Sequence, residues 1–227
     1  AESYVRIRSS GYDRGETLQT KARRAVAAAL RLAPNLPEAH LAQALVAQAV
    51  DFDFEVARRE LDRVEQLRPN DPDVPAARAR IERARGNRSE AFVALALRAV
   101  EADPQNSDTL VLMAGYLTEC GRFADAERFC ERAWSIAHVA EDPIRVSVIN
   151  LIAWTGDVGA ALALLETTPE ALRAPRFYFR RADLRLQRGD LAGARADYEF
   201  VRNQMSERYR DRAGPRLSAV LVRARGP

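Results

Sequence analysis

The side chains that most often carry catalysis or bind a metal are scarce in this chain of 227 residues. It contains two histidines, His40 and His138, and two cysteines, Cys120 and Cys130. A metal centre usually needs three or four such ligands together, and a nucleophile needs a base within hydrogen-bond reach. The sequence also lacks a phosphate-binding glycine loop, a nucleophile elbow and a metal-binding histidine pair. We therefore predict that the protein is not an enzyme and holds no cofactor or metal.

The two cysteines flank a single turn. Cys130 falls in an apolar stripe, where a thiol acts as a small hydrophobic side chain, and Cys120 precedes a glycine at a more exposed position. A disulfide would require side chains that face each other at close range, which the spacing does not establish. We expect two free thiols.

Composition favours helices and a buried core. Hydrophobic residues make up 47% of the chain, and glycine and proline number only 11 each. No stretch approaches the roughly 20 apolar residues that a membrane span needs. We therefore expect a folded protein without a membrane span.

Charge is unevenly distributed along the chain. Residues 172–227 carry 14 arginines and 6 acidic residues, whereas residues 1–171 carry 21 basic and 26 acidic residues. Such an asymmetry can orient an acidic partner, or it can simply keep a protein soluble. The sequence leaves both explanations open.

Three residue types share one period of about 35 residues. The glycines that precede helix-like segments are Gly86, Gly121, Gly156 and Gly189. Alanines inside the following helix keep the same spacing, at Ala22, Ala57, Ala91, Ala126, Ala161 and Ala194. Prolines close three of the units, at Pro34, Pro69 and Pro104. A repeat of this length indicates a supersecondary unit that buries its faces only by stacking on its neighbours.

Each unit is predicted to be an antiparallel helical hairpin. In residues 107–138, Ser107 and Asp108 open one apolar helical stripe, and Asp108 is expected to accept hydrogen bonds at the helix start. Gly121 ends this helix because glycine tolerates the left-handed conformation. A second stripe, which begins at Phe123, then forms the returning helix.

The repeated pattern resembles the tetratricopeptide repeat. The resemblance is carried by Leu110, Ala114, the run Gly121-Arg122-Phe123-Ala124-Asp125-Ala126, and Ala133. It implies an all-α, right-handed superhelical solenoid of antiparallel helix pairs. We expect about six repeats in residues 1–207. Their approximate ranges are 1–36, 37–71, 72–106, 107–140, 141–174 and 175–207.

Some segments depart from the pattern. The turn of the second unit reads Asp51-Phe52-Asp53-Phe54, whose aromatic pair could anchor a partner or fill the gap between repeats. Residues 208–227 form a basic C-terminal segment in which Pro215–Arg225 could be a capping helix, with Leu217, Val220 and Leu221 pointing inward.

The resemblance also implies where a ligand would lie, namely on the inward-facing positions of the first helix of each repeat. Arginine and aromatic residues at such positions most often dominate binding energy. The predicted partner-binding residues are Arg80, Arg83, Glu119, Asn150, Trp154, Arg176, Phe179 and Asp183.

The function predicted from this pattern is that of a non-catalytic scaffold that binds a protein or peptide, with an acidic partner as one option. The alternatives are a regulatory or targeting arm of a larger bacterial enzyme or signalling protein, and an RNA-binding helical-repeat protein. Nucleic acid is not the expected partner, because the paired base-reading residues of RNA-binding repeats do not recur here. Self-association through the repeat ends is left open.

The expected compartment is the cytoplasm of a bacterium. The chain begins at Ala1 and not at methionine, which leaves a trimmed chain, a fragment or a mature periplasmic protein as alternatives.

Overall fold

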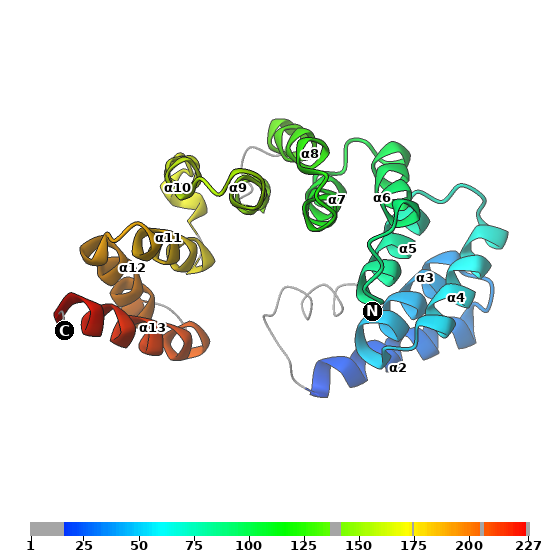
Figure 1. Ribbon diagram of the computed structural model, residues 1–227. Coiled ribbons are helices and arrows are strands. Elements are labelled where there is room, and N and C mark those ends of the chain that lie inside the picture. The colour runs from blue at the N-terminus through cyan, green and yellow to red at the C-terminus, as the bar shows by residue number, and fades with distance from the viewer. Residues whose placement is uncertain (1–15, 137–141, 174, 205–206, 226–227) are drawn as a thin grey trace. The chain divides into compact units, whose positions relative to one another are not determined.

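The computed structural model describes residues 16–136, 142–173, 175–204 and 207–225 (Figure 1). Every regular element within these ranges is a helix, so the predicted all-α class is confirmed. The chain divides into two compact units, residues 1–109 and 110–227. His138 lies outside the described residues.

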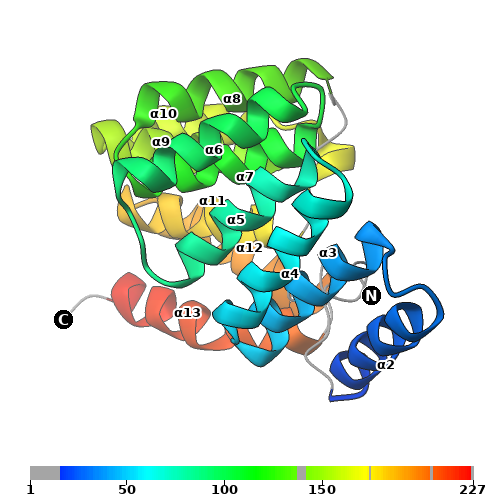
Figure 2. The same ribbon diagram turned by 90° about the vertical axis from the view of Figure 1, so that its right-hand side faces the viewer.

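The first unit consists of helices that pack as consecutive pairs, α3 on α4 and α5 on α6 (Figures 1 and 2). Its elements are α2 (Glu16–Leu32), α3 (Pro37–Val46), the π-helical turn η1 (Ala47–Asp51), α4 (Phe54–Leu67), α5 (Asp73–Ala84) and α6 (Glu90–Ala102).

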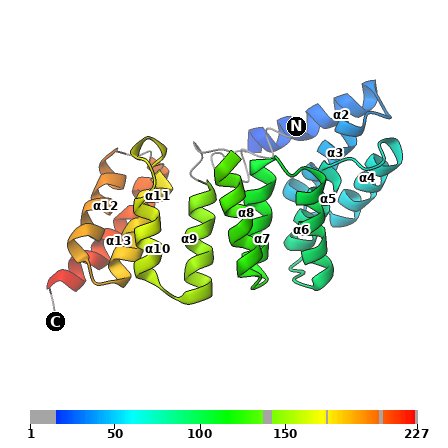
Figure 3. The same ribbon diagram turned by 90° about the horizontal axis from the view of Figure 1, so that it is seen from above.

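The second unit continues the same arrangement, and its helices follow one another in Figure 3. Its elements are α7 (Ser107–Glu119, of which Leu110 onward belongs to this unit), α8 (Phe123–Ile136), α9 (Asp142–Thr155), α10 (Val158–Glu166), the 3-10 turn η2 (Glu170–Leu172), α11 (Pro175–Gln187), α12 (Leu191–Gln204) and α13 (Glu207–Arg225). Helix α13 begins before the predicted start at Pro215, and that proline lies inside it. Leu217 and Val220 of α13 are buried in one cluster with Ala182, Ala194 and Tyr198.

The periodic glycines close the helix pairs through a left-handed turn. Gly86, Gly121, Gly156 and Gly189 have φ angles of 79, 73, 70 and 81°. A Cβ atom built on any of them would meet no atom within 4 Å, so the backbone angle and not space requires glycine. The turn after Gly121 is closed by the Arg122 N–H, which donates to the Leu117 carbonyl at 2.9 Å.

Helix starts are capped by side chains, though not always by the predicted one. Asp157 Oδ1 accepts from the Ala160 N–H at 2.9 Å at the start of α10. At the start of α7 the acceptor is Asn106 Oδ1, 3.0 Å from the Thr109 N–H. The predicted cap, Asp108, is instead an exposed residue in the first turn, where its charge suits the helix dipole.

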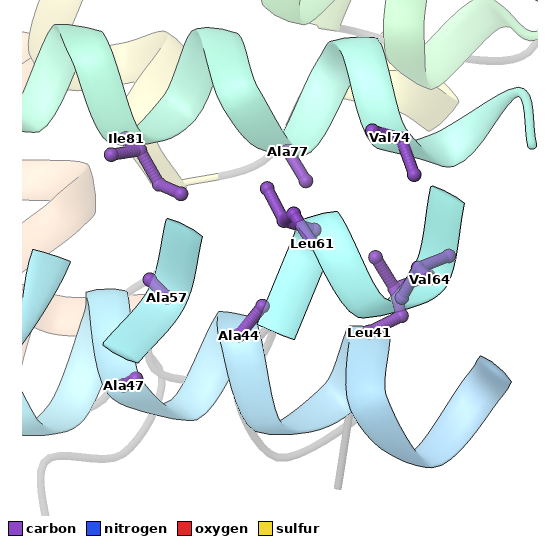
Figure 4. Packing of buried hydrophobic residues seen from close by; sticks show 9 residues of the cluster. All are labelled: Leu41, Ala44, Ala47, Ala57, Leu61, Val64, Val74, Ala77 and Ile81. Atoms are coloured by element: carbon purple, nitrogen blue, oxygen red, sulfur yellow. The ribbon is translucent and has the colours of Figure 1, made fainter. Parts of the chain in front are cut away.

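Small side chains lie where the helices of a pair approach each other. In the cluster of Figure 4, Ala44 and Ala47 of α3 pack with Ala57 of α4, and Leu61 and Val64 extend the contact toward α5. Among the periodic alanines that the structure describes, five are buried. The exception is Ala91, which is exposed because Phe92 occupies the buried position in α6.

The left-handed turn generates a stability prediction. Gly121→Ala should destabilise the protein by about 1 kcal/mol, because a Cβ atom is unfavourable at its φ of 73°. Gly115→Ala is the matched control. It lies inside α7 with open space around its Cβ position, and it should stabilise the protein by up to about 1 kcal/mol. Urea unfolding followed by circular dichroism measures both variants, and an unchanged stability for Gly121→Ala would contradict the account.

Candidate partner-binding site

The described residues hold no group of three or more histidine, cysteine, aspartate or glutamate side chains placed to bind a metal ion. None of the described helices combines the length and the apolar character needed to cross a bilayer. His40 serves packing between elements, since its ring nitrogens lie 2.6 Å from Glu60 Oε2 and 2.9 Å from the Pro34 carbonyl oxygen. It thereby links the connection between α2 and α3 to α4.

Neither cysteine is in a disulfide, although both lie in the described part of the chain. Cys130 is buried in α8, and this burial raises the pKa of its thiol to about 12. Cys120 is half-buried beside the Gly121 turn. A buried thiol that stays protonated is not a nucleophile.

Arg176 joins two first helices of the second unit. It lies in the first turn of α11, and its Nη2 atom is 3.0 Å from Asp142 Oδ1 at the start of α9. The two side chains are 38% and 45% exposed, so the pair is open to solvent. Asp142 was not among the predicted residues.

Phe179 and Asp183 meet a residue of α13. The Arg216 guanidinium lies 5.7 Å from the centre of the Phe179 ring, and its Nε atom is 3.3 Å from Asp183 Oδ1. Asp183 also accepts a hydrogen bond from the Tyr198 hydroxyl. Burial, followed by the hydrogen bond and charge of Asp183, raises the pKa of Tyr198, so this hydroxyl stays protonated. These contacts join α11, α12 and α13.

Trp154 lies away from this group. It is 54% exposed in the last turn of α9, and its ring stacks on Phe123 at the start of α8 with centroids 6.1 Å apart. Asp142 is twelve residues earlier on the same helix, or about 18 Å along its axis. Trp154 and Phe179 therefore do not form one aromatic patch.

Asn150 belongs to a buried polar network. Its Nδ2 group donates to the Phe123 carbonyl and to Glu127 Oε2, both at 3.0 Å, and its Oδ1 accepts from Thr118 Oγ1 at 3.0 Å. Ser147 Oγ also donates to Glu127, at 2.8 Å. Because Asn150 is fully buried and its amide is hydrogen-bonded on both sides, it holds α9 against α7 and α8 and is not presented to a partner.

The remaining predicted residues lie apart from the α11 group. Glu119 is exposed at the last residue of α7. Arg80 is half-buried in the middle of α5, and Arg83 is exposed near its end. The two arginines belong to the first unit and the others to the second.

A pocket in the first unit was not predicted. It has a volume of about 430 Å³ and lies among α4, α5 and α6. Burial alone would raise the pKa of Glu82 on its wall, but hydrogen bonds from Asn87 and Arg58 outweigh burial and lower it. The pocket involves the second helices of two repeats, whereas the predicted site considered only first helices. Its lining is Arg58, Asp62, Arg78, Ile81, Glu82, Asn87, Ala91, Phe92 and Leu95.

The contrast between the two thiols predicts their reactivity. Iodoacetamide at pH 8 should modify Cys120 alone in the folded protein, because the Cys130 thiol is buried and its pKa is about 12. In urea both thiols should react. Mass spectrometry counts the adducts, and rapid double modification of the folded protein would show that Cys130 is accessible.

The buried network predicts a large effect at Asn150. Asn150→Ala should cost about 2 kcal/mol of stability, since it leaves Glu127 and the Phe123 carbonyl without their amide donor. Asn203→Ala makes the same change at an exposed position of α12 and should stay within about 0.5 kcal/mol of the parent. Similar losses in the two variants, measured by urea unfolding, would mean that the network does not stabilise the fold.

No family model matches the sequence, and no curated protein matches it either. Solved structures of similar fold include yeast Tom70, with a TM-score of 0.71, 16% identity, and coverage of 98% of this chain and 47% of the Tom70 chain. The chain therefore spans about half the length of that protein. The type IV pilus biogenesis factor PilW has a TM-score of 0.69 and 14% identity, over 92% of this chain and 94% of its own.

A tetratricopeptide repeat protein from Parabacteroides merdae has a TM-score of 0.63 and 17% identity, over 91% of this chain and 81% of its own. Identities this low show the fold alone. Together with the helix pairs and the glycine turns, they confirm the predicted resemblance at the level of structure. The chain has the tetratricopeptide-repeat fold.

Proposed function

We propose that the chain is a non-catalytic scaffold that binds a peptide or helix of a partner protein on the first helices of its second unit. The observation that carries this proposal is the row of exposed charged and aromatic side chains along α11. Arg176 meets Asp142 of α9, and Phe179 and Asp183 meet Arg216 of α13. The proposed surface, called here the α11 surface, consists of these five residues.

The contacts support placing the surface on one side of the unit. The Arg176–Asp142 pair joins α9 to α11, and the Asp183–Arg216 pair joins α11 to α13. These helices occupy alternate positions in the chain, with α10 and α12 between them. A segment lying across the three helices would contact every member of the surface.

The chemistry of the surface suits recognition of a protein segment. Arginine and aromatic side chains are common anchors of binding energy. Exposed ion pairs contribute only about 0–1 kcal/mol, so a partner carboxylate can replace an internal one at little cost. Arg180, half-buried one turn after Arg176, adds positive charge to α11. We therefore propose an acidic segment as the partner.

The proposal applies whether the chain acts alone or as an arm of a longer protein. Tom70, which is similar in fold, is about twice as long as this chain. The specific surface does not depend on what precedes or follows these residues.

A peptide selection tests the proposal. Peptides selected on the immobilised chain from a random displayed library should be rich in aspartate and glutamate. Arg176→Glu should weaken their binding about tenfold or more in isothermal titration calorimetry, because it reverses the charge at the centre of the surface. Arg202→Glu is the control, since it reverses an exposed charge on α12.

Equal weakening by the two variants would reduce the effect to overall charge. Undiminished binding by Arg176→Glu would place the binding site elsewhere.

A further inference from the structure

The turn between α3 and α4 is one residue longer than the regular turns. Thirteen residues separate Ala44 from the buried Ala57, whereas twelve separate Ala114 from Ala126. The additional residue is wound into the π-helical turn η1. Such turns are rare and are often found at functional sites.

Phe52 takes the left-handed position of this turn. Its φ is 57°, whereas the residues at the left-handed positions of the four later turns between paired helices are glycines. Left-handed backbone is strained for a bulky side chain, because its Cβ approaches the neighbouring carbonyl oxygen. The fold would be served equally well by glycine at this position.

Burial of the ring does not offset this strain. Phe52 is 62% exposed, whereas Phe54, two residues later, packs against the core cluster of α3, α4 and α5. The sequence left open whether these aromatics anchor a partner or fill a gap between repeats. The structure separates them, since Phe54 packs inside and Phe52 lies on the surface.

The side chains around Phe52 are acidic. Asp53 caps α4 by accepting from the Val56 N–H at 2.9 Å, and Glu55 is 3.9 Å from Arg58. Asp51 accepts from Arg23 Nε at 2.8 Å. An exposed aromatic face attracts a cation, and carboxylates beside it strengthen that attraction.

We infer that the α3–α4 turn is a second interaction surface, on which Phe52 anchors an arginine- or lysine-bearing segment of a partner protein. The aromatic ring provides the contact, and Asp53 and Glu55 provide charge complementarity. A strained, exposed phenylalanine at a position suited to glycine is explained by this use. The surface lies in the first unit, so it is independent of the α11 surface.

The test uses the full chain with 15N labelling and two short probes. One is an acetylated pentapeptide of alternating glycine and arginine, and the other replaces its arginines with glutamates. At millimolar concentration the arginine peptide should shift amide resonances of residues 51–56, and the glutamate peptide should not. Any shift from Arg176→Glu should be absent here, because that residue belongs to the other unit.

Two variants separate the anchor from a structural role. Phe52→Gly should weaken the arginine peptide at least fivefold and raise Tm by about 2–4 °C through relief of backbone strain. Phe52→Leu keeps the strain and the apolar bulk but lacks the aromatic face, so it should weaken binding without raising Tm.

The inference is overturned if Phe52→Gly lowers Tm, since Phe52 would then support the fold. It is also overturned if the arginine peptide causes no shifts at residues 51–56, or binds Phe52→Gly as tightly as the parent chain.

Discussion

The close approach of two helices within each pair is the constraint on which the rest of the structure depends. It requires a left-handed residue at the turn, such as Gly121, and a small side chain where the helices meet, such as Ala126. A single pair leaves an apolar face uncovered, so each pair packs on the next. Side chains on alternate helices, such as Arg176 and Asp142, are thereby brought within contact distance although they lie far apart in the sequence.

Much of this fold could be predicted from spacing. Glycine has little reason to recur every 35 residues unless the backbone needs its conformation, and buried alanines recur with it. The failures come from local competition that spacing does not record. Asn106 caps α7 in place of Asp108, and Phe92 displaces Ala91 from the core of α6. An inserted residue is equally invisible to a period that tolerates one residue of variation, as the π-helical turn before Phe52 shows.

The candidate site was predictable in part. A helical position on the expected face identifies neither its depth nor its neighbours, so Asn150 and Arg176 looked equivalent in the sequence. Packing separates them, because Asn150 lies under α7 and α8 whereas Arg176 stays at the solvent edge. Arg216 could be noticed only as one of many arginines near the C-terminus. Its contact with Phe179 depends on how α13 packs beside α11.

The account's central claim is that a partner's carboxylate contacts Arg176 on the α11 surface, and a charge-swap cycle tests it most directly. Each acidic residue of a selected peptide is replaced in turn by arginine and measured against the parent chain and Arg176→Glu. The account predicts that one such replacement, harmful with the parent chain, restores most of the affinity lost in Arg176→Glu. If no replacement restores affinity, Arg176 does not contact the peptide and the proposed surface is wrong.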